Sequence, residues 1–353
     1  MGRRVVIRAD ASRAIGSGHV MRCLTLAGRL RQRGDDVAFV MRELPGNLIA
    51  FTEAKGFRVC RLPLHERDAS LTDYAAWLTV PQEVDAAETL ATLGEGHVDL
   101  LVVDSYALDA TWERRLRIVS KNIFVIDDLA NRVHDCDVLL DQNVYCDAAH
   151  RYDGLVPDSC DVRIGVQYAL LREEFFEVRR HLRKRDGSLW RVLVFYGGSD
   201  LTRETEKAVH ALLAVPELSL TADVVVGSSN AHIDEVRALC DRHANLHLHV
   251  QAQNMAELMA AADLALGAGG TTTWERCYLG LPTLVTAVAE NQLLDAEVCA
   301  GRGLIRYLGY WREVTEERLV EELYLCANPS YLCKLQERCW LDVSADDILA
   351  SMK

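Results

Sequence analysis

The fold is decided by the stretch Val5-Val6-Ile7-Arg8-Ala9-Asp10, which leads through residues 11–17 into Gly18-His19-Val20-Met21-Arg22-Cys23-Leu24-Thr25-Leu26-Ala27. Its first part is an apolar run that predicts a β-strand, and its last part predicts an amphipathic helix. The helix would carry Val20, Leu24, Ala27 and Leu30 on one face. Strand, glycine loop and helix in this order are typical of α/β proteins with parallel sheets.

The loop itself, Gly16-Ser17-Gly18-His19, has the composition of a ligand-binding turn. Glycines allow a ligand to approach the backbone closely, and a helix N-terminus directs free N–H groups at anions. A histidine at that position can take up a proton near neutral pH. The alternative interpretation is a tight turn with a solvent-facing histidine, and the loop alone leaves both open.

Composition narrows the class of protein. The chain has 353 residues, half of them apolar, and a net charge of −13 that is shared by both halves. The size predicts two domains, and the acidic balance argues against nucleic acid or an anionic membrane as a partner. No apolar run approaches the ~18 residues of a membrane span, and the chain enters its first strand without a signal peptide, so we expect a cytoplasmic protein. The 11 cysteines form no Cys-x-x-Cys pair and predict neither a disulfide framework nor a zinc site.

Strand and helix patterns alternate along the whole chain, which predicts two Rossmann-like domains facing a cleft. The predicted strands are 5–10, 37–41, 57–62, 99–105, 122–127, 138–143, one from 191, 222–226, 246–250, 264–266 and 283–285. The predicted helices include 19–33, 81–93 and 109–120, with Asp109 as N-cap of the last. We expect an N-terminal domain at 1–165, a linker at 166–188 with a charged helix from 172 to 185, and a C-terminal nucleotide-binding domain at 189–353. The final helices, from 315 on, are free to pack back on the first domain.

The second half carries its own phosphate-binding pattern in Leu266-Gly267-Ala268-Gly269-Gly270-Thr271-Thr272-Thr273-Trp274-Glu275-Arg276. Backbone N–H groups and hydroxyls at a helix start suit a pyrophosphate, for which Gly269, Gly270, Thr271 and Thr272 are the candidates. Glu275, one turn inside the helix, suits a ribose diol. The alternative is an ordinary threonine N-cap with a glutamate in the first turn.

Two further loops follow predicted strands of the second half. Gly197-Gly198-Ser199 is a weaker version of the phosphate pattern, and Glu290-Asn291-Gln292 offers side chains that suit sugar hydroxyls and amides. A ligand-free turn and an exposed helix cap are the respective alternatives. In the first half, Tyr106 follows a central strand, where it either faces a ligand or packs at the rim.

The sequence gives little support for a serine hydrolase, a P-loop nucleotide site or a metal site. There is no Gly-x-Ser-x-Gly elbow and no P-loop. The Asp-x-Asp of residues 135–137 and the pair Asp127-Asp128 are too short to predict a metal site. His247 and His249 lie on one side of a strand with no carboxylate nearby in sequence, which favours a surface or packed pair. We therefore predict no metal and no cofactor.

Several motifs together resemble the UDP-2,4-diacetamido-2,4,6-trideoxy-β-L-altropyranose hydrolase family of pseudaminic acid biosynthesis, which serves flagellin glycosylation. The matching stretches are Arg8-Ala9-Asp10-Ala11-Ser12 with Gly16 to Leu24, Val103 to Asp109, Ile126 to Ala130 with Leu140 to Asn143, Tyr168 to Arg172, Gly197 to Asp200, Gly267 to Pro282, and Glu290-Asn291-Gln292. They follow in order over nearly the whole chain. Residues 42–96 and the last ~30 residues carry no motif of the resemblance.

The resemblance implies a glycosyltransferase-B fold and metal-independent hydrolysis of a UDP-sugar. It implies His19 as general base. Residues that would meet the sugar are Gly16, Gly18, Arg22, Tyr106, Asn291 and Gln292. Residues that would bind UDP are Gly197, Gly198, Ser199, Gly269, Gly270, Thr271, Thr272 and Glu275. It leaves the oligomeric state open, a monomer included.

Two alternative functions remain at this stage. The transferase that adds N-acetylglucosamine to the lipid-linked peptidoglycan precursor has a similar architecture, but a proline follows its glycine loop where Val20-Met21-Arg22-Cys23 stands here. A protein that binds a nucleotide sugar without catalysis is the other. The intact Gly-x-Gly-His loop argues weakly against it.

Overall fold

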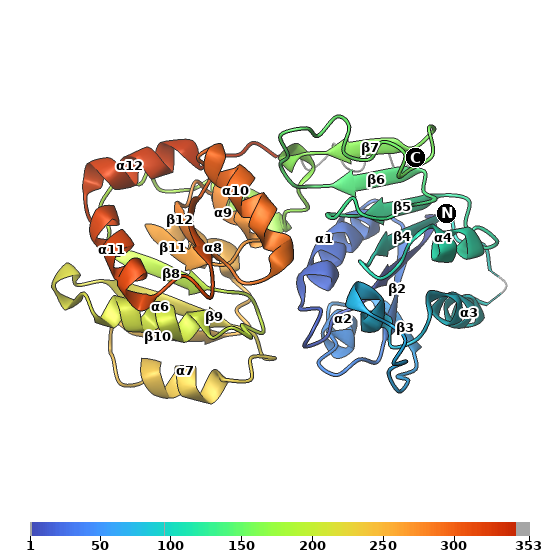
Figure 1. Ribbon diagram of the computed structural model, residues 1–353, viewed down its shortest axis with the longest axis horizontal. Coiled ribbons are helices and arrows are strands. Elements are labelled where there is room, and N and C mark those ends of the chain that lie inside the picture. The colour runs from blue at the N-terminus through green and yellow to red at the C-terminus, as the bar shows by residue number, and fades with distance from the viewer. Residues whose placement is uncertain (1, 95, 344–353) are drawn as a thin grey trace. The chain divides into compact units, whose positions relative to one another are not determined.

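The structure, a computed structural model, describes residues 2–94 and 96–343 and divides into two compact units (Figure 1). The first unit runs to Leu170 and the second from Leu171 to Val343. Each is a parallel sheet with helices on its faces. The prediction of two Rossmann-like domains is therefore confirmed.

The first unit contains a seven-stranded sheet in the order β3-β2-β1-β4-β5-β6-β7. Its strands are β1 (Arg4–Ala9), β2 (Asp36–Arg42), β3 (Arg58–Leu62), β4 (Leu100–Asp104), β5 (Ile123–Ile126), β6 (Val138–Asp141) and β7 (Asp161–Ile164). All neighbours pair in parallel, and β1 lies between β2 and β4 with Ala9 opposite Asp104. The direction of strand succession reverses at β1, so the chain leaves β1 and β4 toward opposite sides of the sheet, and this is the place where open α/β sheets ordinarily bind ligands.

Two apolar clusters, one on each face of this sheet, hold the helices in place. On one face Val5 and Ile7 of β1 pack against α1 (Gly18–Gln32) and α2 (Ile49–Ala54). On the other, Val6 packs with α3 (Gln82–Leu93), α4 (Ala110–Leu116) and the 3₁₀ helix η1 (Asp73–Leu78). Both faces of the central strands are apolar because parallel sheets are covered on both sides.

The second unit repeats the pattern with a six-stranded parallel sheet in the order β10-β9-β8-β11-β12-β13. Its strands are β8 (Arg191–Phe195), β9 (Thr221–Val226), β10 (Leu246–Val250), β11 (Leu264–Gly267), β12 (Thr283–Ala287) and β13 (Arg306–Tyr310). Its helices are α5 (Glu173–Arg179), α6 (Glu204–Leu213), α7 (Ile233–Cys240), α8 (Met255–Ala261), α9 (Thr272–Tyr278), α10 (Leu293–Gly301), α11 (Glu316–Cys326) and α12 (Pro329–Arg338). The short 3₁₀ helix η2 (Val166–Tyr168) lies at the end of the first unit, and η3 (Pro216–Leu218) and η4 (Glu290–Gln292) belong to the second unit. Here the succession reverses between β8 and β11.

The chain passes between the units at Leu170 and Leu171, inside the segment expected as a linker. Beyond that point α5 packs on α8 and α9, and Arg183 and Arg185 hydrogen-bond to carbonyl groups of the second unit. In the same unit, α11 packs on α6 and on α12. The C-terminal part of the chain from 344 on lies outside the described residues.

Some element predictions were wrong. The strands β7 and β13 were missed, because β7 is a half-exposed strand with charges among its four residues and β13 contains Gly309. The helix predicted at 109–120 ends at Leu116, and the charged helix predicted from 172 to 185 ends at Arg179. Asp109 is the N-cap of α4 as predicted, and its carboxylate accepts a hydrogen bond from the N–H of Thr111 at 2.7 Å.

We expect the variant Asp109→Ala to lower the free energy of unfolding by about 1 kcal/mol, since it removes an N-cap from a helix that packs on the sheet. The same carboxylate also accepts a hydrogen bond from Gln82 on α3, and the variant removes that contact as well. Urea denaturation followed by circular dichroism measures it. Asp158→Ala, at an exposed aspartate, is the matched control, and equal midpoints for the two variants would contradict the role of the cap.

Candidate functional site

The glycine loop of the first unit lies at the point where strand succession reverses. Gly16 has φ of +80°, a conformation that favours glycine, and its N–H donates to the carbonyl of Ser12 at 2.9 Å. This closes a turn that brings the chain from β1 into α1. As a result, His19 lies in the first helical turn of α1. Because β1 and β4 are neighbouring strands, His19 is close to the end of β4.

His19 is buried and paired with a carboxylate. Its side chain is 8% exposed, and Nδ1 lies 2.6 Å from Oδ1 of Asp104, the last residue of β4. This contact fixes the ring so that Nδ1 carries the proton that is donated to Asp104. Among the residues that the structure describes, none hydrogen-bonds to Nε2. The solvent-facing histidine of the alternative interpretation is therefore wrong.

Asp104 is fully buried, and its charge is balanced by Arg22. The guanidinium donates from Nε to Oδ2 at 2.6 Å and from Nη2 to Oδ1 at 2.7 Å, and the thiol of Cys23 lies 3.4 Å from Oδ2. Burial alone would raise the pKa of Asp104. The charges of Arg22 and His19 and their hydrogen bonds outweigh it and hold this pKa well below its usual range.

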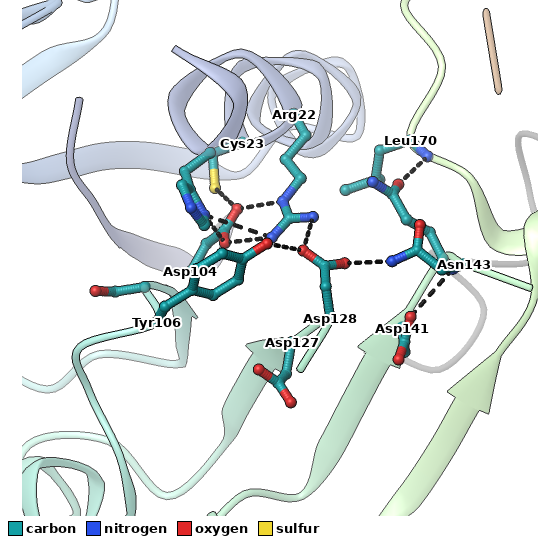
Figure 2. A network of polar contacts seen from close by, with 12 residues as sticks. Arg22, Cys23, Asp104, Tyr106, Asp127, Asp128, Asp141, Asn143 and Leu170 are labelled. Carbon is teal, nitrogen blue, oxygen red and sulfur yellow. Dashed lines mark hydrogen bonds and ion pairs between the residues drawn. The ribbon is translucent and has the colours of Figure 1, made fainter. Parts of the chain in front are cut away.

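The network continues from Arg22 to Asp128 (Figure 2). Oδ2 of Asp128 accepts hydrogen bonds from Nη1 of Arg22 and from the hydroxyl of Tyr106, both at 2.7 Å. Oδ1 accepts one from Nδ2 of Asn143 at 3.1 Å. The ring of Tyr106 meets that of His19 edge to face, with 4.5 Å between centroids. Three predicted site residues, His19, Arg22 and Tyr106, are thus brought together.

In the second unit the predicted loops lie side by side for a topological reason. They follow β8, β11 and β12, which are neighbours in the parallel sheet, so their carboxyl ends share one edge. The glycines Gly197 and Gly270 have φ of +95° and +93°. Gln292 lies next to Gly269, where an added Cβ would meet the glutamine side chain at 3.4 Å. Asn291 and Ser199 sit in two of these loops, and Asn291 is exposed.

The start of α9 leaves several polar groups accessible. Thr271 is the N-cap residue but makes no side-chain capping hydrogen bond, and Gly269, Gly270 and Thr272 are not buried. Within the same helix, Oε1 of Glu275 accepts a hydrogen bond from Nε of Arg172 at 2.9 Å. The second oxygen of Glu275 is buried, and no partner for it is found within the described part of the chain.

Arg276 is a buried cation directly behind this loop. It is 1% exposed, and its Nη2 donates to the carbonyl of Ala268 at 2.6 Å and to the hydroxyl of Thr273 at 3.2 Å. Both partners are neutral, and the structure, over the residues it describes, pairs Arg276 with no carboxylate. Burial lowers its pKa to about 10. The charge of Glu275 acts on this pKa in the opposite sense and raises it without a direct contact, and Nε of Arg276 is buried with no hydrogen-bond partner in the described part of the chain.

Asp104, Asp128 and Asn143 are central to the network, but their roles were missed from sequence. Each of the three residues belongs to a motif of the resemblance and lies at or just after the end of a strand. These strands are neighbours in the sheet, and this adjacency is the feature that could have linked the three residues to His19. The motif at 135–137 is structural, since Arg117 donates to both Asp135 and Asp137 at 2.9 and 2.7 Å. His249 has a carboxylate partner after all, Asp223 on the neighbouring strand at 2.8 Å.

Within residues 2–94 and 96–343 no three or more His, Cys, Asp or Glu side chains are grouped so as to hold a metal ion. Over the same ranges, no helix is both long enough and apolar enough to span a membrane.

Comparison with known proteins confirms the resemblance. Residues 192–338 match the family model of the glycosyltransferase family 28 C-terminal domain. The chain is 25% identical to the UDP-2,4-diacetamido-2,4,6-trideoxy-beta-L-altropyranose hydrolase of Campylobacter jejuni, over 85% of this chain and 97% of that protein. It is 26% identical to the spore coat polysaccharide biosynthesis protein SpsG of Bacillus subtilis, over 90% and 87% of the two chains.

The fold has close structural counterparts. The crystal structure of MurG from Acinetobacter baumannii superposes with a TM-score of 0.63 at 16% identity, covering 99% of this chain and 98% of that one. At this identity the likeness concerns the fold alone. Together with the family 28 match, it confirms the predicted glycosyltransferase-B fold class.

We expect the variant Asp104→Asn to be less stable than the parent at pH 7 by about 3–5 kcal/mol, because Arg22 and His19 lose a buried charge partner. The pKa of Asp104 is lowered by folding, so its contribution is fully present above its unfolded value of about 3.9 and is lost as pH falls below it. The variant cannot lose this contribution. Its stability should therefore fall less steeply than that of the parent between pH 5 and pH 3.

Urea denaturation at several pH values measures both effects. Asp147→Asn, at an exposed aspartate, is the control and should follow the parent. Parallel stability curves for the parent and Asp104→Asn would show that Asp104 is not held ionised by this network.

Proposed function

We propose that the protein hydrolyses a UDP-linked diacetamido-trideoxy sugar at the anomeric carbon, with inversion. The products are UDP and free 2,4-diacetamido-2,4,6-trideoxy-L-altrose, which would serve pseudaminic acid synthesis. The observation that carries the proposal is the contact between Nδ1 of His19 and Asp104, with Nε2 unengaged, at the strand ends where α/β sheets bind ligands. The similarity to the Campylobacter hydrolase supplies the substrate class.

In the proposed step, water attacks the anomeric carbon while the bond to the diphosphate oxygen breaks. Nε2 of His19 takes the proton of the water as the new carbon–oxygen bond forms, and the bonding electrons leave with UDP. Asp104 keeps Nδ1 protonated and stabilises the imidazolium that results, as a buried carboxylate does for a histidine base. Arg22 holds Asp104 ionised and in place.

The second unit would bind the leaving group. UDP needs stabilisation of its developing negative charge, which uncapped amides at the start of α9 and the charge of Arg276 would supply. The unpartnered oxygen of Glu275 suits a ribose hydroxyl. We further propose that Gly197, Gly198, Ser199 and the loop of Asn291 and Gln292 contact the nucleotide and the sugar, respectively.

A UDP-sugar transferase is the second candidate, because the family 28 match and the MurG-like fold are compatible with the same donor site. It would require an acceptor and would release UDP only slowly in water. Binding of a nucleotide sugar without turnover is the non-catalytic outcome. Assays with and without an acceptor such as N-acetylmuramyl-(pentapeptide) pyrophosphoryl-undecaprenol separate the three.

The first experiment is incubation of the purified protein with UDP-2,4-diacetamido-2,4,6-trideoxy-β-L-altropyranose in the presence of EDTA, with products followed by NMR. We expect UDP and the free α-configured sugar as the initial products. The variant His19→Asn should release UDP about 10²–10⁴-fold more slowly while it still binds UDP. Equal rates of UDP release by the parent and the variant would show that His19 is not the general base. If the parent released UDP from none of the UDP-sugars tested, the proposed hydrolysis would be contradicted.

We also expect Arg276→Met to bind UDP about 10–100-fold more weakly than the parent, because it removes the buried charge behind the phosphate loop. Binding of uridine, which has no phosphate, should change little, and the apo variant should remain folded although the carbonyl of Ala268 loses a hydrogen bond. Isothermal titration with UDP, UMP and uridine measures this, with Arg276→Lys as the charge-keeping control. A parallel loss of uridine and UDP binding would indicate a purely structural arginine.

A further inference from the structure

The segment between β3 and α3 carries no motif of the resemblance, yet it brings two aromatic rings to the candidate base. The ring centroids of Trp77 and His19 are 6.3 Å apart at an angle of 74°. Trp77 also stacks on Tyr106 at 5.9 Å and 29°, and Tyr74 contacts both Trp77 at 4.8 Å and Tyr106 at 5.3 Å. We call Tyr74, Trp77 and Tyr106 the aromatic cluster.

The backbone that carries Tyr74 and Trp77 is strained on both sides. Asp73 and Thr79, at the two ends of η1, have φ of +48° and +66°, values that L-residues rarely adopt. For a β-branched residue such as threonine this is a genuine outlier, and each instance costs about 1–3 kcal/mol. A six-residue 3₁₀ helix is also longer than usual.

Anchors on the core hold this conformation. Leu78 and Val80 are buried in the apolar cluster of α3 and α4, and the carbonyl of Thr79 accepts a hydrogen bond from the N–H of Asp68 at 3.0 Å. Strain of this kind persists where the surrounding structure imposes it, and it gathers at functional sites. This segment carries the half-buried ring of Trp77, which contacts His19, and that of Tyr74, which contacts Trp77 and Tyr106.

His19 therefore has polar, charged side chains beside Nδ1 and aromatic rings against its own ring. On the side of Nδ1, Asp104, Arg22 and Asp128 satisfy one another and offer few further hydrogen bonds. The ring contacts of His19 are with Tyr106 and Trp77. Aromatic faces suit C–H and methyl groups, whereas a hydroxyl placed against them loses hydrogen bonds to water without replacement.

We propose that Tyr74 and Trp77 form a specificity element that selects UDP-sugars whose C6 is a methyl group, as in a 6-deoxy sugar, over sugars that carry a hydroxyl on C6. This inference rests on the proposed hydrolysis and adds to it the residues that choose the substrate. Residues 73–79 thus act on the sugar, while His19 acts on the water. One methyl group in an apolar environment is worth about 10–200-fold in kcat/KM.

The test compares the proposed substrate with its analogue that carries a hydroxyl at C6, by rates of UDP release. The parent should favour the 6-deoxy sugar. Trp77→Ala should lower kcat/KM for that sugar by at least 10-fold, mainly through KM, and lower it much less for the hydroxylated analogue, so that the preference collapses. Trp77→Phe, which keeps an aromatic ring, should retain most of the preference.

Trp190→Ala is the matched control, because this tryptophan is exposed in the second unit and should leave the preference unchanged. Thermal melting verifies that each variant is folded, and Tyr74→Leu tests the same cluster if Trp77→Ala does not fold. An active parent without a preference, or a folded Trp77→Ala or Tyr74→Leu that keeps it, would overturn this inference and leave the hydrolase intact. No UDP release by the parent from either sugar would overturn both.

Discussion

The candidate site of the first unit depends on one buried carboxylate, that of Asp104. A carboxylate without exposure is tolerated in a protein only when charged partners and hydrogen bonds replace its water. Arg22 supplies two hydrogen bonds and a full charge, and His19 supplies a third hydrogen bond. The contacts that offset the cost of burying Asp104 also determine that Nδ1 of His19 is the nitrogen that hydrogen-bonds to it.

This arrangement follows from strand order. Asp104 ends β4 and His19 starts the helix after β1, and the two strands are neighbours although 85 residues separate the side chains. Asp128 and Asn143 follow β5 and β6, the next two strands of the sheet. Each successive strand end thus adds one polar side chain to a single row, and Arg22 and Tyr106 join the members of that row.

The sequence predicted what is encoded locally. Alternating apolar runs predicted most strands, and the glycine loops at 16–18, 197–198 and 269–270 follow strands as predicted. Ligand binding at these loops stays a prediction. Contacts between side chains of different strands could not be predicted in this way. No local sequence pattern indicates that His19 pairs with Asp104 and not with Asp128. The position of Trp77 beside His19 was not predicted either, since an aromatic residue in a segment without motifs is interpreted as ordinary core until its neighbours are known.

The two units use similar loops but treat charge in opposite ways. In the first unit Arg22 is shared by the carboxylates of Asp104 and Asp128, so the network beside His19 holds more negative than positive side chains. In the second unit the guanidinium of Arg276 is held by a carbonyl and a hydroxyl and contacts no carboxylate directly among the described residues. An excess of negative charge suits a base that must accept a proton, and a cation without a direct anionic contact suits a diphosphate that must depart with extra charge. This difference in charge fits the distinct roles that the proposed reaction gives to His19 and to Arg276.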